Sequence, residues 1–181
     1  MAEEHSKDIL SEGKKSIVLL QGIFSNSFFD LLRERGVKEV FIMEGRPSCE
    51  AAESSCKELI KRKIKPTLIA DNMAGFLFYK DLVKEVWLSY HIKDKDGALC
   101  YIGALILGIL AKRHGITVNL YPNEHKMALL GKEKEVIYFD GIKVAPPNVR
   151  GYVPLAEWVS SKYITKVFDV ILPRRGTYSA A

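Results

Sequence analysis

The chain has 181 residues and a mildly basic composition, with 27 lysines and arginines against 22 acidic residues and a formal net charge of +5. Its 48% hydrophobic and 27% charged content is that of a folded soluble domain and excludes an intrinsically disordered chain. Three cysteines without C-x-x-C spacing predict neither a disulfide framework nor a zinc site.

In chain order, short apolar runs alternate with longer helical patterns. Strands are predicted at residues 16–21, 39–43, 67–70, 85–89, 116–121 and 135–139, with another near Tyr152. Helices are predicted at residues 26–34, 48–62, 72–79 and 98–112, and a last short one from Ser160 to about Phe168. Most of the strand runs are continuously apolar, which is typical of strands buried on both faces of a parallel sheet.

The alternation of strands and helices predicts an α/β fold with a doubly wound, mainly parallel, Rossmann-like sheet and helices on both faces. We expect one such domain over residues 16–172, a helical or flexible segment at 1–15 and a tail at 173–181. The predicted helix at 98–112 is apolar nearly all round, which fits a subunit interface and deep burial within one chain equally well.

Two features bear on location and partners. The first ten residues are polar, unlike a signal peptide, and the apolar stretch at 98–111 is too short for a membrane span. We therefore expect a cytoplasmic protein that does not associate with membranes. The basic run at 57–65 alternates with apolar residues, so we interpret it as a solvated helix end and not as a nucleic-acid patch.

Ligands of open α/β sheets bind at the carboxyl ends of the strands. The residues that follow the predicted strands are therefore the candidates for ligand binding: Gln21, Gly22, Glu44, Arg46, Glu50, Asp71 and Asn72. The candidates for acid–base chemistry, all weak, are Asp71, Tyr90 and His91.

Arg46, at a predicted helix start, suits pairing with a phosphate, and the alternative is a salt bridge to Glu44 or Glu50. Asp71 suits an acid, a base or, more often for its residue type, a helix N-cap. The turn after the first strand lacks G-x-G-x-x-G and the histidines lack metal-ligand spacing, so we expect no dinucleotide cofactor and no metal.

Three segments, taken in order and spacing, carry a family resemblance: E-G-R-P at 44–47, T-L-I-A-D-N-M-A at 67–74, and the I-G to H-G-I helix at 102–116. G-I-K-V-A-P at 141–146 and Y-V-P at 152–154 add to it. Together they resemble the family of the translation initiation factor 2B α, β and δ subunits, methylthioribose-1-phosphate isomerase and ribose-1,5-bisphosphate isomerase. The resemblance runs from about 16 to 169 and implies the members' C-terminal Rossmann-like domain, without their helical N-terminal domain.

The departures from the isomerases fall at functional positions. The resemblance places Gly22 where the isomerases have a catalytic cysteine, and Tyr90 where they have a catalytic aspartate. Tyr101 stands in place of a substrate-binding lysine, and Glu50 in place of a glutamine. The initiation-factor subunits similarly lack the cysteine.

We therefore expect a non-catalytic member of the family that self-associates, with a homodimer implied by the resemblance, and that binds a phosphorylated sugar or nucleotide near Arg46 and Asp71. The alternative is a sugar-phosphate aldose–ketose isomerase with a rearranged active site. A third hypothesis is an accessory protein that binds nucleic acid or the translation machinery. It rests on the net charge and the family name alone.

Overall fold

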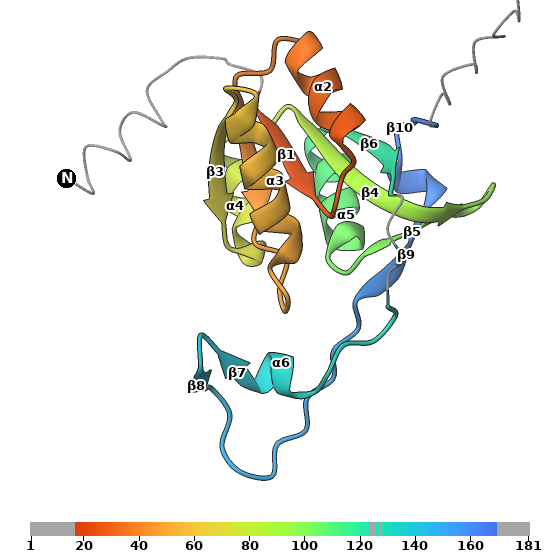
Figure 1. The fold of residues 1–181 in the computed structure, drawn as a ribbon. Helices are drawn as coiled ribbons and strands as arrows, with labels where there is room; N and C mark the ends of the chain where they lie inside the picture. Colours follow the sequence, from red (N-terminus) through yellow and green to blue (C-terminus); the bar gives the residue numbers. More distant parts are fainter. Residues whose placement is uncertain (1–16, 124–125, 127, 170–181) are drawn as a thin grey trace, which may run out of the picture.

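The parallel sheet at the centre of the molecule confirms the predicted fold class. The computed structural model describes residues 17–123, 126 and 128–169 (Figure 1). Six parallel strands follow the order β10-β6-β4-β1-β2-β3. They are β1 (Val18–Gln21), β2 (Glu39–Met43), β3 (Lys65–Ile69), β4 (Glu85–Lys93), β6 (Thr117–Pro122) and β10 (Lys166–Val167).

Helices cover both faces of this sheet, as the apolar strand patterns predict. On one face α2 (Asn26–Glu34) and α3 (Glu50–Lys61) pack on alternate residues of the strands, such as Val18 and Leu20. On the other face the short turn η1 (Asp71–Met73), α4 (Ala74–Tyr79) and α5 (Ala104–His114) pack on Leu19 and its neighbours. The two apolar layers fix the strands, whose carboxyl ends then meet at one edge.

An antiparallel extension of the sheet was not predicted. β5 (Gly97–Tyr101) pairs with the long strand β4, and β9 (Ala156–Ser160) pairs with β5. The predicted helix at 98–112 is therefore wrong over its first residues, because Gly103, with φ of 93°, separates the strand from α5. A continuous apolar run has no period by which a buried strand can be told from a buried helix.

Two further predictions near the C-terminus are wrong. The helix expected from Ser160 to about Phe168 is instead the single turn η2 (Ser161–Tyr163) followed by β10, which pairs with the edge of β6. The strand expected at 135–139 is mostly the short helix α6 (Lys134–Ile137), and Tyr152 lies outside any strand. Local propensity is weak in these segments, and for β10 the pairing with the distant strand β6 decides the conformation.

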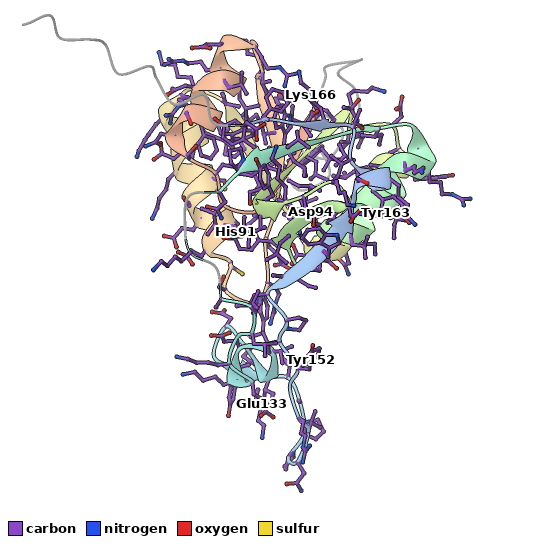
Figure 2. All side chains as sticks on the ribbon, turned by 90° about the vertical axis from the view of Figure 1, so that its right-hand side faces the viewer. His91, Asp94, Glu133, Tyr152, Tyr163 and Lys166 are labelled. Carbon is purple, nitrogen blue, oxygen red and sulfur yellow. The ribbon has the colours of Figure 1, made fainter. Side chains whose placement is uncertain are left out.

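Residues 128–155, which we call the arm, extend away from the sheet (Figure 1). The arm holds α6 and the hairpin of β7 (Tyr138–Phe139) and β8 (Ile142–Lys143). At its base the two segments of chain are joined by backbone hydrogen bonds, from Gly131 to Val153 and from Leu155 to Leu129. In Figure 2, Glu133 and Tyr152 lie on the arm, well apart from His91 in the body of the domain.

The predicted segments 1–15 and 173–181 lie outside the described residues. Among the residues that are described, no helix is long and apolar enough to cross a membrane.

Candidate functional site

A cavity of about 590 Å³ lies between the carboxyl ends of β1 and β2 and the base of the arm. Of the predicted site residues, it is lined by Gln21, Gly22, Arg46 and Glu50. Sequence reasoning missed the cavity residues of the arm and its approach, which include Lys126, Lys132 and Glu135. No motif marks these residues, and only the folding of the arm brings them to the sheet edge.

Asp71 fixes the turn that carries Arg46. Its Oδ1 accepts a hydrogen bond from the backbone N–H of Gly45 at 2.9 Å, and its Oδ2 accepts one from the N–H of Arg46 at 2.8 Å. The N-cap interpretation of Asp71 is therefore wrong, because the residue before η1 is Ala70 and no side chain caps that turn. Hydrogen bonds to a carboxylate are stronger than neutral ones, so this clamp holds the turn firmly.

Arg46 faces the arm across the cavity. Its guanidinium carbon lies 4.2 Å from the centre of the Phe139 ring. The sequence offered a salt bridge from Arg46 to Glu44 or Glu50 as the alternative. All three residues are described, and no such salt bridge is formed between them. Stacking occupies only the flat face of a guanidinium, so its N–H groups stay available for an anion.

Gly22 has no room for a side chain. A Cβ atom built on Gly22 lies 2.0 Å from the Ser89 hydroxyl and 2.9 Å from the Tyr101 ring. The backbone of Gly22 has φ of +102°, a conformation that residues with a Cβ rarely adopt. The position that the resemblance gives to a catalytic thiol is thus filled by two neighbouring side chains.

Tyr101 lines the cavity, at the position where the resemblance replaces a substrate-binding lysine. Its hydroxyl accepts a hydrogen bond from Asn123 Nδ2 at 3.0 Å, and the same Nδ2 lies 3.3 Å from His91 Nε2. Burial raises the pKa of Tyr101, the Asn123 hydrogen bond opposes that shift, and the charge of Glu50 adds to it. A neutral phenol held in this way is suited to hydrogen-bond a ligand and to position it. It exchanges protons poorly near neutral pH.

Tyr90 is buried, and its phenol does not line the cavity. It donates hydrogen bonds to the carbonyl of Phe168 and to Asp169, both at 3.2 Å. Burial, followed by the charge of Asp169, raises the pKa of Tyr90 to about 12. Its geometry joins the last described residues to the sheet, and a catalytic role for Tyr90 stays a prediction.

The remaining candidates lie near the cavity without lining it. This holds for Glu44, Asp71, Asn72 and His91, of which Asp71 acts on the cavity through the Arg46 turn. Their roles in binding stay predictions. Within the described part of the chain, no group of three or more His, Cys, Asp or Glu side chains is arranged to hold a metal ion.

The parallel sheet, with a cavity at its carboxyl edge and an arginine in the turn that precedes α3, defines a Rossmann-like domain with a candidate ligand site. The profile of the "Initiation factor 2 subunit family" matches residues 5–169, and the chain belongs to that family. This confirms the resemblance read from the sequence.

Two curated relatives that are similar to the chain are methylthioribose-1-phosphate isomerases. It is 30% identical over 141 residues to the methylthioribose-1-phosphate isomerase of Thermosipho melanesiensis, covering 71% of this chain and 41% of the relative. It is 31% identical over 153 residues to that of Koribacter versatilis, covering 78% of this chain and 42% of the relative. The chain thus spans less than half the length of these curated relatives.

Solved structures share the fold. Subunit delta of translation initiation factor eIF-2B from A. fulgidus has a TM-score of 0.73 and 21% identity, over 92% of this chain and 57% of that one. The 5-methylthioribose 1-phosphate isomerase of Pyrococcus horikoshii OT3 has a TM-score of 0.72 and 22% identity, over 88% and 51%.

Proposed function

We propose that the chain binds a phosphorylated sugar in the cavity at the ends of β1 and β2. The observation that carries this proposal is the clamp of Asp71 on the backbone of Gly45 and Arg46, which holds an arginine at the cavity wall. A preorganised arginine needs little further ordering when it binds an anion.

The cavity is lined by groups suited to an anion and by one suited to hydroxyl groups. Arg46 lies in the turn before α3, Ser48 of that turn and Ala51 of the first turn of α3 also line the cavity, and a helix N-terminus favours negative charge. Glu50 lines the same cavity, and its carboxylate is suited to accept hydrogen bonds from sugar hydroxyls.

The names of the relatives support this class of ligand, since methylthioribose 1-phosphate is a sugar phosphate. They also favour the second candidate function, isomerisation of such a sugar, more directly than they favour binding without turnover. The surroundings of Gly22 point the other way, because Ser89 and Tyr101 occupy the space that a side chain at position 22 would need. Binding without turnover is our leading expectation, and isomerisation by a rearranged set of groups is the alternative.

Thermal shift and calorimetry with methylthioribose 1-phosphate, ribose 1,5-bisphosphate and unphosphorylated methylthioribose test the binding. We expect a phosphorylated sugar to raise the melting temperature, and Arg46→Ala to weaken its binding by tenfold or more, on the order of the loss of one charge-assisted contact. Arg33→Ala is the matched control, since Arg33 lies exposed on α2 with only a long contact to Asp30. Absence of binding by every phosphorylated sugar contradicts the proposal.

Turnover separates the two candidates. Conversion of either phosphorylated aldose to its ketose, followed by NMR with purified protein, establishes the isomerase alternative if the rate depends on Arg46. Binding of the same compounds with no conversion over a day establishes a binding domain.

A further inference from the structure

Strand β1 ends in a buried amide. It consists of three apolar residues followed by Gln21, and all four are buried. Because side chains alternate along a strand, Gln21 lies on the same face of the sheet as Leu19, towards α5. The side chain lines the cavity, although Gln21 is only 6% exposed. Burial of an amide costs free energy unless its polar atoms form hydrogen bonds, so each of them needs a partner.

The chain itself satisfies only part of the Gln21 amide. Nε2 donates a hydrogen bond to the carbonyl oxygen of Ile102 at 2.5 Å. Oε1 is buried and has no hydrogen-bond partner among the described residues. The reverse orientation of the amide would set Oε1 against the Ile102 carbonyl, so that two acceptors faced each other, and the contact therefore fixes which atom is which. The second N–H of Nε2 and the carbonyl oxygen remain for another partner.

The backbone between β5 and α5 holds this amide in the wall of the cavity. A Cβ atom at position 103 would lie 2.7 Å from Gln21 Nε2, and Gly103 has φ of +93°. Glycine at this position thus leaves room for the amide and forms the turn that follows the Ile102 carbonyl. Ile102 and the preceding Tyr101 line the same cavity, so the Gln21 amide lies among residues that a ligand would contact.

We infer that Gln21 is a specificity-determining residue of the cavity, whose amide recognises a hydroxyl group of the bound sugar. A hydroxyl group both donates and accepts hydrogen bonds, which matches the carbonyl oxygen and the N–H that remain on the amide. A phosphate dianion only accepts hydrogen bonds, so it would leave Oε1 unpaired, and it suits the charged guanidinium of Arg46 instead. The inference rests on the proposed function and identifies the residue that distinguishes one sugar from another.

This role makes a ligand without the hydroxyl group a poor ligand. Such a ligand leaves Oε1 buried and unpaired in the complex, and sites built to hydrogen-bond a hydroxyl discriminate strongly against its absence. A buried water that satisfies Oε1 permanently is the competing explanation. It predicts that the affinity for the ligand hydroxyl does not depend on Gln21.

Calorimetry with methylthioribose 1-phosphate and its 2-deoxy and 3-deoxy forms tests the inference. We expect the wild-type chain to bind one of the two deoxy forms about tenfold more weakly than the intact sugar phosphate. Gln21→Met keeps the approximate volume and removes the amide, and we expect it to bind the intact compound about tenfold more weakly and that deoxy form as the wild-type chain does. Inorganic phosphate, which carries no sugar, should bind both proteins equally, whereas Arg46→Ala should weaken its binding.

Ser89→Ala is the matched control. Ser89 Oγ is also buried without a partner among the described residues, but Ser89 does not line the cavity. The control should keep the wild-type affinities for all three sugar phosphates. Gln21→Asn, whose amide is one methylene shorter, should show the same loss as Gln21→Met and replaces it if circular dichroism shows that Gln21→Met does not fold.

The outcomes separate this inference from the proposed function. Deoxy penalties that are the same in the wild-type chain and in Gln21→Met overturn the inference, while binding that depends on Arg46 still supports the proposed function. Absence of binding by every phosphorylated sugar contradicts the proposed function. Unphosphorylated methylthioribose and its deoxy forms, titrated at millimolar concentration, then test Gln21 by itself, and binding that is absent or independent of Gln21 overturns the inference as well.

Discussion

Residue 22 is where backbone conformation and neighbouring side chains together require glycine. Gly22→Ala forces a Cβ against the Ser89 hydroxyl and the Tyr101 ring and also imposes an unfavourable positive φ. We expect a loss of about 3 kcal/mol in the free energy of unfolding, combining backbone strain with overpacking. Urea denaturation measures it.

Gly36 provides the matched comparison. It also has a positive φ, of 73°, but a Cβ there has nothing within 4 Å. Gly36→Ala should therefore lower the free energy of unfolding through backbone strain alone, by about 1 kcal/mol. Equal losses in the two variants would show that Ser89 and Tyr101 yield easily, and that the cavity floor has space for a thiol after all.

The phenol of Tyr90 gives stability a specific alkaline dependence. Its pKa is raised to about 12, so the folded state retains the proton after the unfolded chain has lost it near pH 10. The stabilising contribution of the neutral phenol is complete below pH 10 and is lost as the pH rises to about 12, a loss of about 2 to 3 kcal/mol.

Tyr90→Phe isolates this contribution in urea denaturation between pH 8 and pH 12. The variant starts less stable, because it lacks the hydrogen bonds to Phe168 and Asp169, and its stability falls less steeply above pH 10. In both proteins stability still declines at alkaline pH because of Cys100, a buried thiol whose pKa is also raised to about 12. Parallel curves for the two proteins would contradict the assignment to Tyr90.

Among the elements, the arm differs most from the sheet in how its backbone is protected. The strands β1, β4 and β6 lie in the middle of the sheet with paired neighbours on both sides. The arm is joined by backbone hydrogen bonds at its base, and its hairpin β7–β8 pairs only two residues of each strand. We expect amides at 133–150 to exchange with deuterium at least a hundredfold faster than those of β4, as measured by mass spectrometry. Equal protection in the free chain would show that the arm is packed against further structure.

The elements also show what the sequence predicts well. Five of the six parallel strands, all except β10, are predictable because both faces of the sheet are covered, so their apolar runs are continuous and short. β5 was missed because the run of which it is part continues into α5, and only Gly103 divides them. β10 consists of two exposed residues, and its pairing with β6 has no local signal.

The candidate site divides in the same way. Arg46 and Glu50 were found because the residues after a strand meet at one sheet edge whatever the details of the fold. The clamp by Asp71 and the contact with Phe139 join positions 25 and 93 residues apart, and such pairs leave no trace in local spacing.

At the scale of the whole molecule, the basic residues are dispersed along the chain. In the densest basic run, most of them form ion pairs with carboxylates. In the run at 57–65, Lys57 pairs with Glu53, Lys61 with Glu58, and Arg62 with both Asp30 and Glu58. Cations that already face carboxylates release few counterions from a nucleic acid, and counterion release is the main source of nonspecific affinity.

The net charge therefore predicts weak, salt-sensitive association with RNA. In fluorescence anisotropy with a labelled single strand of about 20 nucleotides, we expect a Kd weaker than about 10 µM at 150 mM salt and little binding at 300 mM. Glu58→Gln supplies an internal check, since it frees Lys61, while Arg62 keeps its pair with Asp30, and it should tighten this association about twofold to threefold. Submicromolar binding by the wild-type chain that persists at 300 mM salt would instead revive an RNA-binding role, because only base contacts or stacking escape screening.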